Sequence, residues 1–293
     1  MFKIISDSAC DFSEKEAKEQ NIQLIPFYIS LDGETFLKEG VDIQKKEYFE
    51  KLRSDKKLFP KTSQPSPQDY IDALTPHLSN GEDVLVFTIS SHLSGSNQSA
   101  VNASKILGEE FPQRQIIIID SLSGCIGQGI ILREIIRMRD AGLDVLKAKE
   151  ITEKIIKDTT DIYFTPDTLE YLKKGGRIGA ASALVGGLLN LRPILHILNG
   201  KAEPLDKVRG RKNAMKIMKE TLTKVLGEEK NSFNVSVGHI LSEPEALEFK
   251  SSIEETLEIK IDNPLTDVGA TVGTHIGPGA LAVSYCKKYE SFL

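Results

Sequence analysis

Short apolar runs alternate with amphipathic segments along the first half of the chain. The runs cover residues 2–6, 23–30, 83–89 and 115–120. Each has the length of a strand, and the segments after them carry apolar residues at helical spacing. Buried strands that alternate with helices are typical of a parallel sheet with helices on both faces. We therefore predict an α/β domain with three layers.

Local capping signals place several of these helices. Ser13 with Glu16 three residues later has the pattern of a capping box. Ser66 followed by Pro67 predicts an N-cap and a first helical residue, with a helix to about residue 78. Further helices are expected around residues 48–52 and over 126–142.

The second half has a different pattern. Residues 161–165 read as a strand, and a short helix that ends at Gly175-Gly176 precedes a glycine- and alanine-rich helix. Asn199-Gly200 between two apolar runs predicts a hairpin. A basic helix is expected over 210–226. Further strands are expected over 234–241, 258–261 and 280–286. This pattern favours an α+β domain with a mixed, mostly antiparallel sheet, so we divide the chain into domains 1–160 and 161–293.

Composition narrows the classes of partner. The net charge is −5, there is no Trp and aromatic residues are 6% of the chain, so a nucleic-acid surface is not expected. The three cysteines form no CxxC pair, which is typical of a reducing compartment. The N-terminus lacks the apolar stretch of a secretion signal, and no run approaches ~18 apolar residues. We expect a cytoplasmic protein without integral membrane association.

Hydroxyl-rich loops stand where the predicted parallel strands end. They are Asp7-Ser8, residues 90–96 and Asp120-Ser121. Ligands of open α/β sheets bind at these carboxyl ends. Residues 90–96 also open a helix, whose first N–H groups attract anions. Ser94 could cap this helix or contact a ligand, and the spacing leaves both readings open.

Three other features carry weaker signals. Thr62 lies in a polar, proline-rich loop that by itself reads as a solvent loop before a helix cap. His275 lies among glycines over residues 273–279, although a lone histidine is more often structural. Arg177 follows a helix end that explains Lys173 and Lys174 by the helix dipole but does not explain the arginine. The basic run with Arg209 and Arg211 reads as a solvated helix face.

Several catalytic motifs are missing from the sequence. There is no GxxxxGK[ST] phosphate loop, no GxSxG nucleophile elbow and no cluster with metal-ligand spacing. We expect no metal and no cofactor. One alternative is an acyl-transfer hydrolase with Ser94 as nucleophile, His275 as base and Asp7 or Asp120 as orienting group. A DNA-binding regulator is disfavoured by the acidic charge.

Taken in order, these pieces resemble the DegV family of fatty-acid-binding proteins across nearly the whole chain. The matching stretches are residues 5–8 with Asp11, 62–66, 90–100, 120–121, 171–178 and 274–280. One departure is His92, where glycine is more usual. It is expected to alter the geometry of the loop and not the role of Ser94.

The resemblance implies a function that the spacing alone does not give. A long-chain fatty acid would lie in a tunnel between the two domains, its carboxylate held by Thr62 and Ser94 with the Gly95 N–H and His275 nearby. Such proteins serve as the non-catalytic binding subunit of a fatty acid kinase. A separate ATP-dependent subunit then makes the acyl phosphate for phospholipid synthesis. Arg177, Arg209 and Arg211 are candidates for docking that partner.

Overall fold

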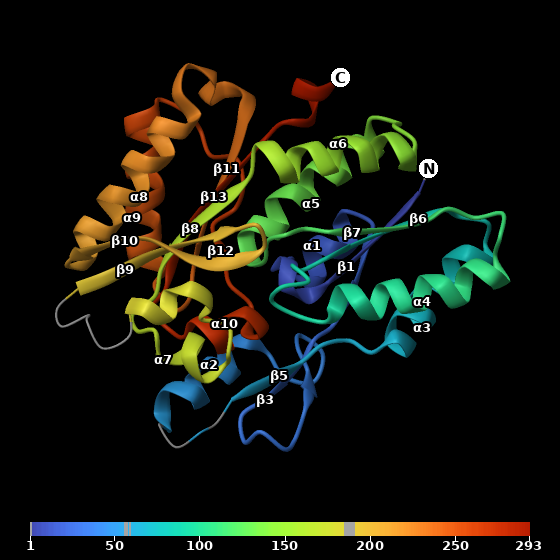
Figure 1. Ribbon diagram of the computed structural model, residues 1–293, viewed down its shortest axis with the longest axis horizontal. Coiled ribbons are helices and arrows are strands. Elements are labelled where there is room, and N and C mark those ends of the chain that lie inside the picture. The colour runs from blue at the N-terminus through green and yellow to red at the C-terminus, as the bar shows by residue number, and fades with distance from the viewer. Residues whose placement is uncertain (1, 56–57, 59, 185–190) are drawn as a thin grey trace.

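The computed structural model describes residues 2–55, 58, 60–184 and 191–293. Its first sheet has four parallel strands in the order β2-β1-β6-β7 (Figure 1). The strands are β1 (Lys3–Asp7), β2 (Ile22–Ile25), β6 (Val84–Thr88) and β7 (Ile116–Asp120). All five residues of β6 are buried, as expected for a central strand covered on both faces.

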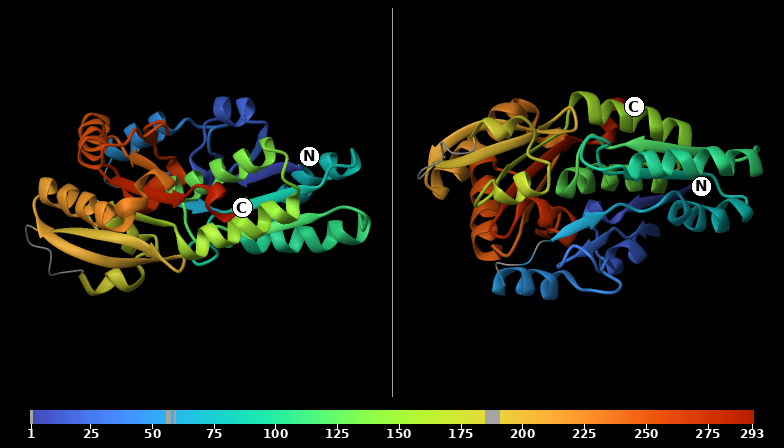
Figure 2. Two further views of the ribbon diagram at one scale, coloured as in Figure 1. Left: turned by 90° about the horizontal axis from the view of Figure 1, so that it is seen from above. Right: turned by 60° about the horizontal axis from the view of Figure 1, so that its bottom comes forward.

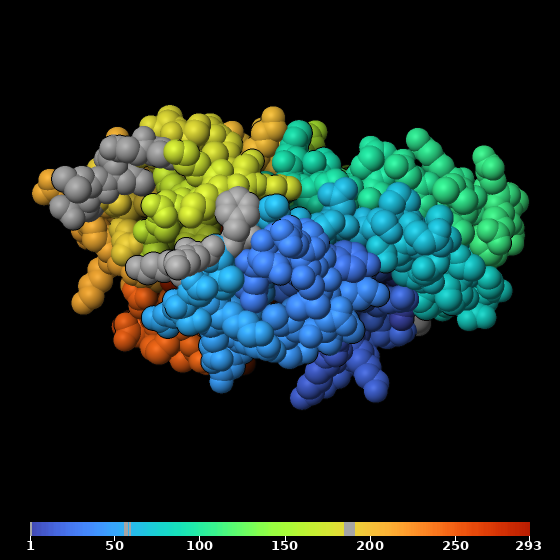
Figure 3. Space-filling view, turned by 90° about the horizontal axis from the view of Figure 1, so that it is seen from below, coloured from blue at the N-terminus to red at the C-terminus, as the bar shows by residue number. Residues whose placement is uncertain are grey.

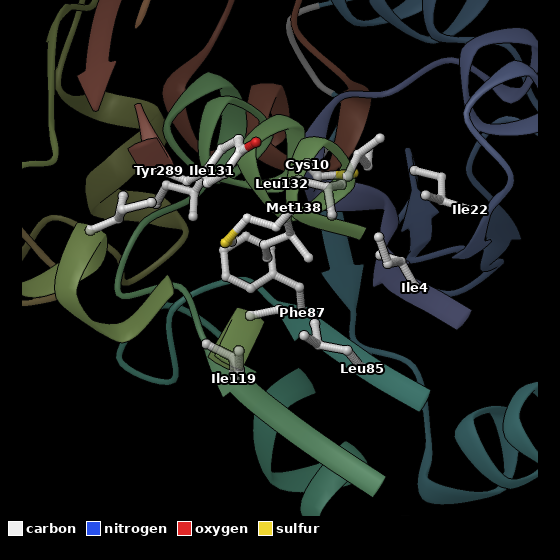
Figure 4. Packing of buried hydrophobic residues seen from close by; sticks show 14 of the residues in the cluster. Ile4, Cys10, Ile22, Leu85, Phe87, Ile119, Ile131, Leu132, Met138 and Tyr289 are labelled. Carbon is white, nitrogen blue, oxygen red and sulfur yellow. The ribbon is translucent and has the colours of Figure 1, made fainter. Parts of the chain in front are cut away.

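Helices cover both faces of this sheet. They are α1 (Glu14–Glu19), α3 (Pro67–Ser79), α4 (Ser96–Glu110), α5 (Cys125–Asp140) and α6 (Val145–Asp158), with the short 3₁₀ helix η1 (Ser8–Cys10) after β1. Leu85 and Phe87 of β6 point to α5 and α6, whereas Val84 and Val86 point to α3 and α4. Figure 4 shows Leu85 and Phe87 among the side chains of the first cluster. The predicted three-layer α/β arrangement is confirmed.

A small antiparallel sheet, not expected from the sequence, lies beside this domain. It comprises β4 (Leu37–Lys38), β3 (Tyr28–Ser30) and β5 (Lys61–Ser63), with α2 (Lys45–Ser54) between β4 and β5 in the chain. The single strand predicted over 23–30 is therefore wrong. The chain divides at Pro26, which has no N–H to continue the ladder, into β2 of one sheet and β3 of another. In Figure 3 this blue segment adjoins the yellow region around residue 170.

The second half forms a six-stranded sheet in the order β10-β9-β8-β13-β11-β12, in which only β11 and β12 pair in parallel. The strands are β8 (Asp161–Thr165), β9 (Leu191–Leu198), β10 (Lys201–Arg209), β11 (Phe233–His239), β12 (Thr266–Asp267) and β13 (Leu281–Lys287). The mixed, mostly antiparallel sheet is confirmed. So is the β9–β10 hairpin, because Asn199 and Gly200 both have positive φ, as a type I′ turn requires.

Helices lie on both faces of this second sheet. They are α7 (Glu170–Lys174), α8 (Arg211–Leu226), α9 (Glu243–Leu257) and α10 (Ala270–Ile276), with 3₁₀ helices η2 (Gly179–Leu184), η3 (Gly227–Ser232) and η4 (Tyr289–Phe292). α8 and α9 pack on one face, and α5 contacts β8, β11 and β13 from the side of the first domain. Figure 2 shows α8 and α9 (orange) at one end of the long axis and α4 (green) at the other.

Three other sequence predictions need comment. The strand predicted over 258–261 is wrong: Glu258 has a left-handed φ of 51° that ends α9, and Ile261 packs among the α8 and α9 side chains. The helix predicted after Gly176 begins as η2, and its continuation past Leu184 lies outside the described residues. The boundary at residue 160 falls between α6 and β8 and stays a prediction. Across the described ranges, no helix is both long enough and apolar enough to cross a membrane.

Asp11 connects the first domain to α10 from a half-buried position. Its Oδ1 accepts the Gly269 N–H at 2.9 Å, and Gly269 is the N-cap of α10. Oδ2 has no hydrogen-bond partner among the described residues. Burial raises the pKa of Asp11 from 3.8 to about 7, with the nearby Glu39 as a smaller cause.

We predict that Asp11→Asn removes a pH dependence of stability. The folded protein binds the Asp11 carboxyl proton more tightly than the unfolded chain does. The contribution of Asp11 to the free energy of unfolding is therefore greatest below pH 3.8 and is lost as pH rises through about 7. The loss is on the order of 4 kcal/mol. Urea unfolding from pH 4 to 9 should show that the free energy of unfolding of the variant increases relative to that of the wild type as pH rises. The exposed Asp72→Asn is the control, and parallel profiles for wild type and Asp11→Asn would contradict the prediction.

Candidate functional site

A largely apolar cavity lies between the two sheets, where β6 ends. Its lining comes from both predicted domains. The apolar side chains include Phe27, Ile89, Leu93, Ile162, Phe164, Leu172, Ile197, Ile240, Val268, Val272 and Ile276. The cavity is narrow, with a volume of about 90 Å³, so a long chain requires these side chains to move apart. A mostly apolar wall with few polar groups suits an elongated hydrophobic ligand.

Polar groups converge on the cavity from separate elements. Thr62 lies in β5, Ser94 in the loop between β6 and α4, and His275 in α10. The structure thus brings three of the four predicted ligand-binding residues to one cavity. Arg177, predicted only as a docking residue, also lines it.

His275 is held as a neutral side chain against Thr62. Its Nε2 lies 2.8 Å from Thr62 Oγ1, and its Nδ1 has no partner among the described residues. Burial, with the Arg177 charge as a second cause, lowers the pKa of His275 from 6.5 to about 4. A buried N–H without an acceptor is costly, so we place the proton on Nε2, where it is donated to Thr62. The Thr62 hydroxyl proton then remains available to a ligand oxygen.

Ser94 retains a free hydroxyl proton as well. Its Oγ accepts the Ser96 N–H at 3.3 Å, which is a bond typical of a helix start, and Gly95 is the N-cap residue of α4. Accepting this bond leaves the hydroxyl proton free to donate. The two readings of Ser94, cap and ligand contact, are compatible in this geometry.

The Gly95 N–H has an acceptor within the protein. It donates to Gln64 Oε1 at 3.2 Å, and Gln64 lines the cavity. Sequence reasoning did not select Gln64. A signal was available, because residues 62 and 64 are two apart at a strand end and so share a face.

The loop that carries Ser94 is fixed at both ends by Asp7. Asp7 Oδ2 accepts the Ile89 N–H at 3.0 Å and the Ser96 hydroxyl at 2.7 Å, and Gln128 donates to Oδ1 at 2.9 Å. Burial raises the pKa of Asp7 from 3.8 to about 6, although these hydrogen bonds oppose the shift. From the sequence, Asp7 is expected in a hydroxyl-rich loop at a strand end and as a possible orienting group for a hydrolase.

Two contacts from the second half of the chain also hold this loop. The Ser90 hydroxyl donates to the Gly200 carbonyl at 2.8 Å, at the tip of the β9–β10 hairpin. Arg177 Nε donates to the Leu93 carbonyl at 3.1 Å. The loop therefore connects the two predicted domains and positions Ser94 between them.

The three arginines proposed for docking have different surroundings. Arg177 is half-buried at the cavity, and Arg209 is exposed at the end of β10. Arg211 pairs with Asp167 at 2.9 Å and Glu245 at 2.7 Å, and its side chain is only 16% exposed. Of the three, Arg209 is the most accessible to a partner, and docking itself stays a prediction.

The groups of the hydrolase alternative do not form a relay. In the described part of the chain, no hydrogen bond links Ser94 to His275, and no carboxylate accepts from His275 Nδ1. Asp7 is bonded to Ile89, Ser96 and Gln128. Asp120 accepts the N–H groups of Ser91 and Leu122. A nucleophile needs a base in contact with it and a group that orients the base.

Comparison with known proteins adds independent findings. The DegV family model, described as a family of uncharacterised proteins, matches residues 1–288. A DegV domain-containing protein of Clostridium acetobutylicum is 33% identical over 286 residues, which cover 97% of this chain and 96% of that protein.

Two solved structures are similar over their whole length. A stearic-acid-binding protein from Eubacterium ventriosum is 34% identical with a TM-score of 0.94, and the match covers 99% of this chain and 100% of that one. A fatty-acid-binding DegV family protein from Thermus thermophilus is 27% identical with a TM-score of 0.88, covering 98% and 99%.

Gly175 provides a test of how His275 is held. A Cβ at this position would lie 2.2 Å from His275 Nδ1, whereas the backbone of Gly175 is in the right-handed helical region that alanine adopts freely. We predict that Gly175→Ala displaces the imidazole, exposes it, and raises its pKa from about 4 toward 6.5.

NMR titration of the His275 ring would measure this shift. Gly108→Ala is the matched control, because no atom lies within 4 Å of a Cβ built there. An unchanged His275 pKa in the Gly175 variant would show that this contact does not position the ring.

Proposed function

Because this chain belongs to the DegV family, we propose that it binds a long-chain fatty acid, with the acyl chain in the cavity and the carboxylate at its polar end. The observation that carries the proposal is the junction of an apolar channel with the Thr62, Ser94 and His275 cluster. The two similar structures described above are named for fatty-acid binding, which supports the same ligand class.

The apolar lining provides the driving force for binding the chain. Each CH₂ removed from water contributes about 0.8 kcal/mol. A saturated chain has no polar atom beyond its head group. A lining with few polar side chains therefore leaves few hydrogen-bonding groups without a partner when the chain is bound. The affinity therefore depends mainly on the length of chain that the cavity accepts.

The polar end of the cavity suits a carboxylate that must remain accessible to a partner enzyme. Thr62 and Ser94 supply neutral hydroxyl donors, and hydrogen bonds to a charged acceptor contribute about 1.5–3 kcal/mol each. Neutral His275 adds no buried charge, so the carboxylate is not locked in a buried ion pair with a large desolvation cost. Arg177 provides a positive charge at the cavity that favours an anion.

We further propose that the chain is a binding subunit without catalysis of its own. It would present the carboxylate to a separate ATP-dependent kinase subunit, and the acyl phosphate would feed phospholipid synthesis. The sequence lacks a phosphate-binding loop, and Ser94 and His275 are not paired as nucleophile and base. Arg177 and Arg209 are the candidates for partner docking, and the expected location is the cytoplasm.

Mass spectrometry of ligand extracted from the purified protein tests the ligand class. We expect a fatty acid at near one equivalent per chain, because so apolar a cavity retains lipid during purification. A nucleotide or a polar metabolite at that stoichiometry would contradict the proposal.

Substitutions at the polar end test the residue assignment. Ser94→Ala and Thr62→Val each remove one hydroxyl donor, so each should weaken fatty-acid binding about 10- to 100-fold. A fluorescent fatty-acid displacement assay gives the dissociation constants. Ser63→Ala is the matched control, since this neighbour is exposed on the other face of β5.

Circular dichroism should show that these variants keep the fold. If Ser94→Ala and Thr62→Val bind as tightly as Ser63→Ala, the carboxylate lies elsewhere. Supplied with a kinase subunit and ATP, the two site variants should also form acyl phosphate more slowly than the control.

A further inference from the structure

Gln64 covers a backbone donor, the Gly95 N–H, next to the polar end of the cavity. Its Oε1 accepts the Gly95 N–H at 3.2 Å, and its side chain lines the cavity beside Thr62 and Ser94. An amide oxygen and a carboxylate oxygen are both acceptors for the same N–H. The side chain therefore holds the place of one ligand oxygen.

The contact between Gln64 and Gly95 is close. A Cβ built on Gly95 would lie 2.5 Å from Gln64 Nε2 and 2.9 Å from its Cδ. The amide thus rests directly on the main chain where α4 begins. No other side-chain or backbone hydrogen bond of the Gln64 amide is found in the described residues.

We propose that Gln64 is a displaceable cap on the Gly95 N–H, which the fatty-acid carboxylate must replace when it binds. This inference rests on the proposed function. A charged carboxylate accepts an N–H bond roughly twice as strong as a neutral amide does, so the exchange favours the ligand. Gln64 is exposed, and its amide can move into water and regain hydrogen bonds there.

The cap lowers the affinity of the site for the carboxylate head group. The Gln64 bond stabilises the ligand-free site and must be broken each time the carboxylate enters. Removing the amide should therefore favour the complex. Replacing the amide with a carboxylate should do the reverse, because a charge-assisted acceptor would hold the Gly95 N–H more tightly and repel an anion.

Stearate binding to delipidated protein at pH 8 tests the cap, measured by displacement of a fluorescent fatty acid. Gln64→Ala should bind stearate about 2- to 10-fold more tightly than the wild type, as expected for one neutral hydrogen bond. Gln64→Glu should bind it at least about 10-fold more weakly. Gln98→Ala is the matched control, because Gln98 lies in the first turns of α4 and its amide donates to Asn102, away from the Gly95 N–H.

A backbone readout distinguishes the cap from a general effect on structure. In the ligand-free protein, Gln64→Ala should move the Gly95 amide resonance, and stearate should then bring wild type and variant to a common position. Weaker binding by Gln64→Ala would show that Gln64 holds the ligand, and this outcome would overturn the proposal of a cap. Equal dissociation constants overturn this inference alone, whereas a wild type that binds no stearate overturns the proposed function and the inference with it.

Discussion

The hydrogen bond between Thr62 and His275 is the contact on which the site depends. It joins β5 of the small sheet to α10 across 213 residues of sequence. The neutral imidazole donates its Nε2 proton to Thr62, and Gly175 provides the room for the ring. Asp11 holds the other end of α10 through the Gly269 N–H. The Thr62 hydroxyl is thus oriented by contacts that lead from Asp11 through α10 to His275.

Hydrogen bonds from neutral donors hold Asp7, Asp11 and Thr62 in place, although Asp11 Oδ2 and His275 Nδ1 have no partner among the described residues. Asp7 receives three such hydrogen bonds and thereby fixes the loop that carries Ser94. Because unpaired buried polar groups are expensive, each of these networks specifies a single geometry. The directional hydrogen bonds of the polar end contrast with the apolar channel, where dispersion and burial are non-directional and tolerate ligands of different shape.

The sequence predicts the elements that rest on local signals. The buried run of β6, the Ser66–Pro67 helix start and the Asn199-Gly200 hairpin all follow from periodicity or turn chemistry. The small sheet does not, because β4 has two residues and β5 pairs with β3 from beyond α2 in the chain. The meeting of Thr62 with His275 is likewise invisible to spacing. It came only from the ordered resemblance to a family, which carries three-dimensional information that one sequence does not.

The position of the cavity follows from the alternation of side chains in the second sheet. Along β13, Val283 packs with α8 and α9, whereas Ala282 on the opposite face borders the cavity. The same division holds on β11, where Val237 is in the core and Gly238 lines the cavity. Since successive strand residues point to opposite faces, the residues of one face pack in the core while residues of the other face line the cavity. In the first sheet, by contrast, bulky residues pack on both faces of β6. The two faces of the second sheet therefore have different roles: one packs against α8 and α9 as a stable core, and the other borders the cavity in which the acyl chain is proposed to lie.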